Sequence, residues 1–173
     1  MEERKPISHL QAGLLIAAIL IVYSIALNFL GQAANQSLGS ISYLIMIVGI
    51  IIFVRMHGSA MNNSLSFGEL FAYGFKTTSV LTILFIGFLI IFNVIFPELK
   101  EQAFEMARQK MEEAGNLSDD KIDQALEIGK KFFWIGIVGG TLIFFVIIGA
   151  IGAAIGAAVT KKDQINPLDQ TIE

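Results

Sequence analysis

The residues best suited to chemistry in this 173-residue chain are His9, His57, Glu69 and Lys76, at the ends of apolar segments. Imidazole, carboxylate and ammonium groups gathered at one membrane interface could exchange protons, as acid–base catalysis requires. The two histidines come from separate segments without the spacing of metal ligands, so catalysis and metal binding are not expected. We therefore predict an interfacial ionisable cluster of His57, Glu69 and Lys76, and no catalytic, metal or cofactor site.

Two asparagines, Asn28 and Asn93, are the other polar candidates, because each lies near the end of an apolar segment. A hydrogen bond between their amides across a helix pair would contribute about 1 kcal/mol inside a membrane. A polar substrate pathway would use the same side chains. Transporters usually carry ionisable groups deep in the bundle or helices broken at the midplane, and the sequence has neither signal.

Composition places these residues in a membrane protein. The chain is 54% hydrophobic and only 16% charged, and its charges are confined to a few stretches, as the cost of burying charge in lipid requires. The absence of cysteine excludes disulfides, thiolate nucleophiles and cysteine-rich metal sites. A net charge of -3 without a basic, aromatic-rich cluster excludes nucleic acid as a partner.

Four long apolar segments, of which only the third contains a charge, Lys76, predict an all-α fold, a membrane bundle of four transmembrane helices in a single domain over residues 1–162. The spans are expected at about 12–30, 41–54, 71–96 and 132–159, against the ~20 residues that cross a bilayer; the second is the shortest, and the fourth is longer than a membrane requires. The first could instead be a signal peptide, but its apolar stretch outlasts a signal sequence and further spans follow. Arg55 is expected to end the second span, and the last residues, 163–173, are expected to form a flexible tail.

An extramembrane helical hairpin is expected between the third and fourth spans, at about 98–131. This stretch holds nine of the fifteen acidic residues and six of the twelve Lys and Arg residues. Apolar residues recur there every three or four positions in two stripes, and Gly115-Asn116 separates the stripes as a turn.

Small residues in the fourth span form two GxxxG pairs, and they predict close helix packing. The predicted packing positions are Gly136, Gly140, Gly149, Gly152 and Gly156. Two alternatives stay open: the glycines form a homodimer face, or they pack within the chain's own bundle against Gly13 and Ala17 or against Gly49.

Orientation rests on a weak charge argument. The first connection, 31–40, has no charge and is the clearest translocated segment, so both termini are expected in the cytoplasm and the acidic hairpin outside. Lys130 and Lys131, beside the fourth span, argue for the opposite orientation.

The order of these segments resembles a known family. A loop runs into Ser66-Phe67-Gly68-Glu69-Leu70-Phe71, Phe96-Pro97-Glu98-Leu99 opens the acidic hairpin, and a Gly/Ala-rich last span ends at Lys161-Lys162. The chain is similar to the uncharacterised four-span bacterial integral-membrane proteins of the domain-of-unknown-function type (DUF4199-like). The resemblance covers nearly the whole chain; it implies a bacterial inner-membrane location and offers no catalytic residues.

These observations favour a non-enzymatic scaffold or accessory subunit that docks a partner through its helical hairpin. The alternative is a small transporter or channel component that works as an oligomer. The expected partners are the lipid bilayer and an unidentified membrane or periplasmic protein, with a homo-oligomer left open and no cofactor.

Overall fold

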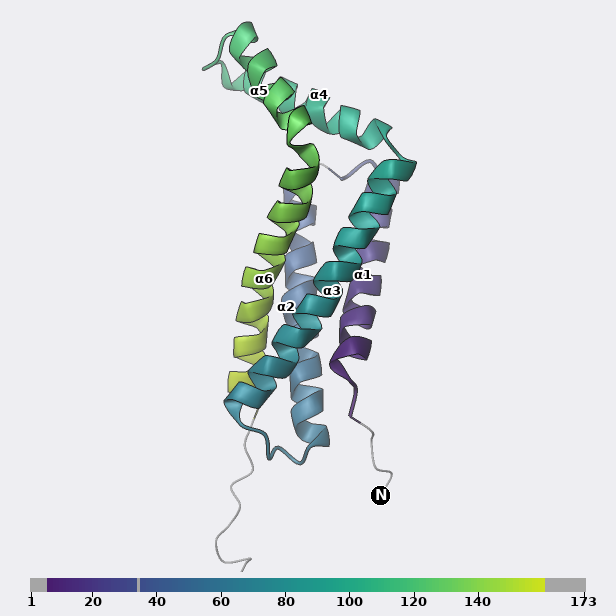
Figure 1. The fold of residues 1–173 in the computed structure, drawn as a ribbon, viewed down its shortest axis with the longest axis vertical. Helices are drawn as coiled ribbons and strands as arrows, with labels where there is room; N and C mark the ends of the chain where they lie inside the picture. Colours follow the sequence, from purple (N-terminus) through teal and green to yellow (C-terminus); the bar gives the residue numbers. More distant parts are fainter. Residues whose placement is uncertain (1–5, 34, 161–173) are drawn as a thin grey trace, which may run out of the picture. The chain divides into compact units, whose positions relative to one another are not determined.

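The computed structural model describes residues 6–33 and 35–160, and every regular element in these ranges is an α-helix (Figure 1). Four of the helices are long and apolar enough to cross a membrane, namely α1, α2, α3 and α6. The predicted fold class, an all-helical chain with four candidate membrane spans, is confirmed. In chain order the helices are α1 (His9–Phe29), α2 (Gln36–Ala60), α3 (Phe67–Ile95), α4 (Glu98–Ala114), α5 (Asp119–Lys131) and α6 (Phe133–Val159).

Polar side chains begin three of the long helices. Ser8 starts α1 in a capping box with Gln11, and the Asn35 side chain accepts the backbone N–H groups of Ser37 and Leu38 at the start of α2. At α3, the backbone N–H of Ser66 donates to the Glu69 carboxylate over 2.8 Å, and the Glu69 N–H donates back to the Ser66 hydroxyl. Such caps satisfy N–H groups that have no partner within the helix.

The second span differs most from its expected bounds. The sequence placed it at 41–54 with Arg55 as its end, whereas α2 runs from Gln36 to Ala60. A charge can end the stretch that lies in hydrocarbon without ending the helix, because arginine is a good helix former. The polar but uncharged residues 36–40 are helical as well, because Asn35 caps them. The expected tail, 163–173, and the Lys161-Lys162 stop lie outside the described residues.

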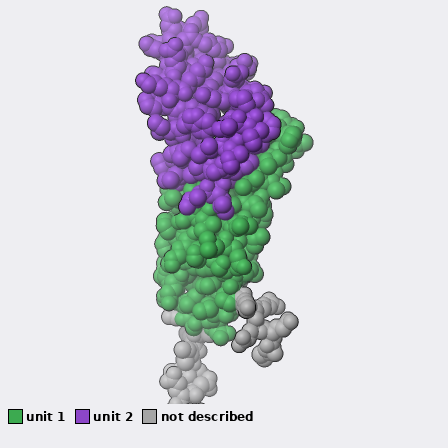
Figure 2. All heavy atoms as spheres, turned by 45° about the vertical axis from the view of Figure 1, so that its right-hand side comes forward, with its two compact units in different colours: residues 1–82, 145–173 green, residues 83–144 purple. Residues whose placement is uncertain are grey.

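The chain divides into two compact units, residues 1–82 with 145–173 (unit 1) and residues 83–144 (unit 2) (Figure 2). Unit 1 contains α1, α2, the first part of α3 and the last part of α6. Unit 2 contains the rest of α3 and α6 together with α4 and α5.

The interior of unit 1 is apolar and closely packed. Its fully buried large side chains come from three helices and include Ile16, Leu20, Met46, Ile50 and Leu81. Three buried threonines of α3 donate their hydroxyls to carbonyls four residues earlier in the same helix, at Tyr73, Gly74 and Thr78. These hydrogen bonds stabilise the buried threonines, because an unsatisfied polar group in hydrocarbon costs several kcal/mol.

Large apolar side chains also cover much of the outside of the four long helices. Leu14, Val22, Leu44 and Ile83 are each more than half exposed. A soluble protein rarely leaves such continuous apolar surface in water. Because hydrocarbon tails solvate these side chains as well as a protein core does, the outer surface fits a multi-pass membrane protein.

Candidate functional site

Helices α4 and α5 form an antiparallel pair within unit 2. Gly115 ends α4 with a φ of 64°, a left-handed conformation that glycine adopts without strain. Ile122 and Leu126 are the buried residues of α5, and Phe104 of α4 packs over Gly129, where a Cβ would lie 3.1 Å from the phenyl ring. The pair therefore has a small apolar seam of its own.

An ion pair joins the two helices near their turn. The Arg108 guanidinium donates a hydrogen bond to the Asp123 carboxylate across the pair, and it lies 3.6 Å from the Glu112 carboxylate on its own helix. The hydrogen bond and the charge of Asp123 raise the pKa of Arg108, so the guanidinium stays charged throughout the working pH range. The two ion pairs of Arg108 contribute little to the stability of the fold, because the side chains of Arg108, Glu112 and Asp123 are 41 to 59% exposed.

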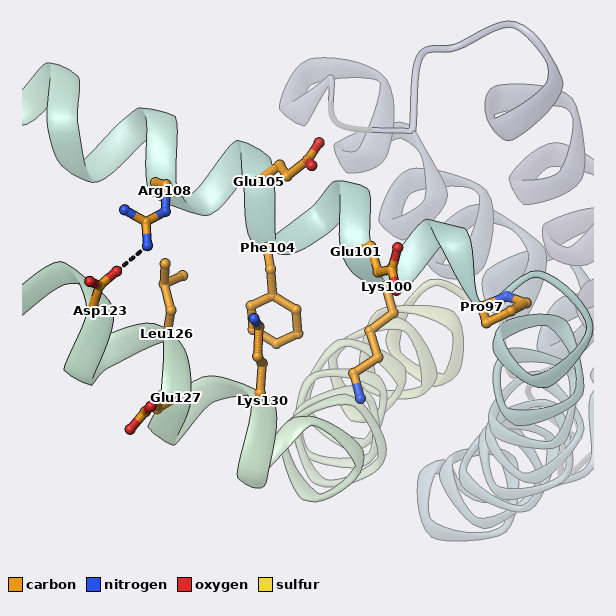
Figure 3. Close-up of a pocket in the computed structure, with 10 residues that line it drawn as sticks. All are labelled: Pro97, Lys100, Glu101, Phe104, Glu105, Arg108, Asp123, Leu126, Glu127 and Lys130. Carbon is orange, nitrogen blue, oxygen red and sulfur yellow. Dashed lines mark hydrogen bonds and ion pairs between the residues drawn. The ribbon is translucent and has the colours of Figure 1, made fainter.

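Between α4 and α5 lies a cavity of about 800 Å³, which we call the α4–α5 cavity (Figure 3). Phe104 and Leu126 form its apolar floor, and charged side chains of both signs surround them. Its lining residues are Pro97, Lys100, Glu101, Phe104, Glu105, Arg108, Asp123, Leu126, Glu127 and Lys130.

Two lysines at one end of the cavity lie over aromatic rings. Lys130 Nζ is 5.8 Å from the centre of the Phe104 ring, and Lys100 Nζ is 4.8 Å from the centre of the Phe133 ring. The two rings contact each other, with their centres 5.7 Å apart. The two distances from an ammonium nitrogen to a ring centre fall within the ~6 Å over which a cation is attracted to the face of a ring.

A second polar group lies in unit 1, where His57 of α2 stacks on Tyr73 of α3. The ring centres are 3.9 Å apart and the rings are nearly parallel. The Tyr73 hydroxyl donates to the backbone carbonyl of Ile7 over 2.9 Å, which ties the segment before α1 to α3. Among the described residues the buried Nδ1 of His57 has no hydrogen-bond partner.

The predicted ionisable residues have different surroundings in the structure. His57 is partly buried against Tyr73, whereas Glu69 is exposed and its carboxylate serves the cap of its own helix with Ser66. Lys76 is exposed on the side of α3. The interfacial cluster of these three residues stays a prediction, and no set of three or more metal-ligating side chains occurs in residues 6–33 and 35–160.

The two predicted intramembrane asparagines bond within their own helices. The Asn28 amide donates to the Ser24 carbonyl, and the Asn93 amide donates to the Leu89 carbonyl, each over 2.9 Å. Each amide thus satisfies a donor locally. The bond between Asn28 and Asn93 stays a prediction.

The glycines of α6 divide into two groups. Gly149, Gly152 and Gly156 are buried in unit 1; a Cβ on Gly149 would collide with Thr78 of α3, and a Cβ on Gly156 would lie 3.0 Å from Cβ of Val54 in α2. A Cβ on Gly152 would meet the backbone of Ile47 at 3.4 Å. By contrast, a Cβ on Gly136 or Gly140 would meet nothing within 4 Å among the described residues.

Sequence reasoning missed Tyr73, and it also missed Lys100, Phe104 and Lys130 as cavity residues. A signal existed for Tyr73, because a tyrosine in an apolar helix needs a partner for its hydroxyl. No local signal marked the other three, because their meeting depends on how α4 and α5 pack.

The comparisons with known proteins agree with the segment order found in the sequence. Neither the curated proteins nor the solved structures gave a significant match. A family model described as "Protein of unknown function (DUF4199)" matches residues 11–162. This range covers the α4–α5 pair and all four candidate spans, apart from the first two residues of α1. The chain therefore belongs to the DUF4199 family, whose function is unknown.

Proposed function

We propose that this protein is a non-enzymatic scaffold or accessory subunit, in which four membrane helices anchor the α4–α5 pair and the pair docks a partner protein. The observation that carries the proposal is the α4–α5 cavity, a hollow of about 800 Å³ with an apolar floor and a charged rim. A groove between two helices that offers apolar contact at its centre and polar contact at its edge suits an added helix of another protein.

Charge narrows the kind of partner. The cavity is lined by four carboxylates against three cations, and one of the cations, Arg108, is already paired with Asp123. The carboxylates of Glu101, Glu105 and Glu127 are left to meet an incoming segment. We propose a basic helical segment of a membrane or periplasmic protein that places an apolar side chain over Phe104 and Leu126.

Several features support a binding role over an enzymatic one. The lining of the cavity includes no histidine, serine, threonine, cysteine or tyrosine, so it offers no hydroxyl or thiol nucleophile and no histidine base. Transport as an oligomer has less support, because the interior of unit 1 is filled by apolar side chains and by closely approaching helices.

We further propose a bacterial inner-membrane location with both termini in the cytoplasm, from the uncharged first connection.

The first experiment is affinity purification in mild detergent through a tag at the C-terminus. The wild-type chain is compared with one in which residues 98–131 are replaced by a flexible linker, and with Glu105→Lys, which reverses one charge on the rim. Glu113→Lys is the matched control, because it makes the same change on an exposed residue of α4 outside the cavity lining.

A partner that docks in the cavity is retained by the wild-type chain and by Glu113→Lys. It is lost with the linker and weakened by Glu105→Lys, because a basic segment would be repelled. Equal recovery of every co-purifying protein from the wild-type and linker chains would refute the docking role.

A further inference from the structure

The pair of lysines at one end of the α4–α5 cavity is the starting point. Lys100 of α4 and Lys130 of α5 come from different helices, and their ammonium groups lie over two rings that contact each other, Phe133 and Phe104. Both lysines line the same cavity. Each ammonium group is attracted to the face of its own ring, and the two rings are in contact.

Neither lysine is neutralised by an acid, although α4 and α5 are rich in acids. Among the described residues neither Lys100 nor Lys130 forms a salt bridge; both ion pairs found belong to Arg108. Figure 3 shows the carboxylates of Glu105 and Glu127 turned away from the Phe104 ring, over which the Lys130 ammonium lies. Both ammonium groups are therefore free of ion-pair contact and available to an anionic ligand, although the Glu101 carboxylate also lines the cavity.

The lysines also lie where two membrane spans end. Helix α3 ends at Ile95, just before α4 begins, and α5 passes into α6 at Phe133. Trp134, in the first turn of α6, packs against Phe133 with ring centres 5.4 Å apart. Tryptophan and lysine at the end of a span are typical of the headgroup level of a bilayer.

We propose that the Lys100–Lys130 end of the α4–α5 cavity binds the phosphate of an anionic phospholipid headgroup. The two ammonium groups would donate hydrogen bonds to phosphate oxygens, and the acyl chains would follow the apolar outer faces of α3 and α6, where Val94 and Ile135 are more than 60% exposed. This site shares Phe104 with the proposed partner site, but it does not rest on that proposal, because lipid binding is tested on the purified chain without a partner.

The chain contains a reporter for this site, since Trp134 is its only tryptophan. The purified protein is reconstituted into phosphatidylcholine bilayers that contain a small fraction of phosphatidylglycerol brominated near the headgroup end of its acyl chains. Bromine quenches tryptophan fluorescence at short range, so quenching of Trp134 reports lipid beside the lysines. The reference is the same fraction of brominated phosphatidylcholine.

The proposal expects brominated phosphatidylglycerol to quench Trp134 at a lower mole fraction than brominated phosphatidylcholine. Each lysine near a membrane surface contributes roughly 1 kcal/mol, so each is expected to strengthen the preference about fivefold and the two together about thirtyfold. Lys100→Gln with Lys130→Gln should remove that preference. Lys110→Gln with Lys121→Gln removes the same charge from exposed positions outside the cavity and should keep it.

Three results would overturn the proposal. Equal quenching of the wild-type protein by both brominated lipids would do so without any variant, so a variant that fails to fold leaves the test intact. A preference that survives the Lys100/Lys130 double substitution, or falls equally in the control, would show that general surface charge is responsible. Loss of the preference on adding millimolar inorganic phosphate would assign the lysines to a soluble anion instead of a lipid.

Discussion

Replacing single glycines by alanine tests how closely the helices of unit 1 pack. A Cβ on Gly13 of α1 would lie 2.7 Å from Cβ of Val80 in α3, and one on Gly74 of α3 would lie 2.7 Å from Cβ of Ala153 in α6. Real Cβ atoms essentially never come closer than 3.0 Å, so the helices must move apart. Gly140 is the control, because a Cβ there meets nothing within 4 Å among the described residues.

Two opposing terms give the expected change in the free energy of unfolding. Alanine gains about 1 kcal/mol over glycine within a helix, whereas overpacking costs about 1 to 3 kcal/mol. Gly140→Ala should therefore be neutral or stabilising by up to about 1 kcal/mol, and Gly13→Ala and Gly74→Ala should lose up to about 2 kcal/mol. Gly152→Ala should resemble the control, since its Cβ would make ordinary contacts at 3.4 Å.

The assay is unfolding by sodium dodecyl sulfate in mixed micelles, followed by circular dichroism. The order expected from least to most stable is Gly13→Ala and Gly74→Ala, then wild type, then Gly140→Ala. Gly152→Leu and Gly156→Leu should lower stability and the yield of folded protein further, because leucine would force α6 away from the backbone of α2. If Gly13→Ala and Gly74→Ala are as stable as Gly140→Ala, the close helix contacts are wrong.

Three further predictions concern other parts of the chain. Gly115→Ala should destabilise the α4–α5 pair by about 1 kcal/mol, because alanine is strained at the φ of 64° found at this position, whereas Gly115→Asn should cost less. The rate at which a protease cuts the turn measures both changes, and equal rates for the two variants would contradict the strain argument. Tyr73→Phe removes the hydroxyl that bonds to the Ile7 carbonyl and should cost about 1 kcal/mol, seen as faster hydrogen exchange at the start of α1 with the remaining helices unchanged. A reporter enzyme fused after Glu173 should behave as cytoplasmic, and periplasmic activity would reverse the proposed orientation.

The sequence by itself determined the number of long helices apolar enough to cross a membrane; that the segment between the third and fourth of them lies outside the membrane stays a prediction. Apolar stretches of about 20 residues between charges suffice to place spans, because the bilayer penalises charge and fixes the length. Pro97 and Gly115 then mark the start and turn of the helical pair, through local backbone preferences that need no tertiary contact.

Helix ends were less well determined, because α2 continues past Arg55 to Ala60. Hydropathy reports where lipid ends, and a helix can extend into the headgroups beyond that point. The polar stretch 36–40 is helical for a similar local reason, the Asn35 cap.

Only the tertiary structure decided which faces meet. The four candidate membrane helices are largely apolar all round, so no amphipathic stripe marks the face that packs. The sequence therefore could not separate buried Gly149, Gly152 and Gly156 from Gly136 and Gly140, which have open space around them among the described residues. The stacking of His57 on Tyr73 joins residues from two helices in the same way. The cavity exists because α4 and α5 are rotated about their axes so that the lysines lie over Phe104 and Phe133. That rotation is set by packing between helices, and the periodicity of residues along one helix does not encode it.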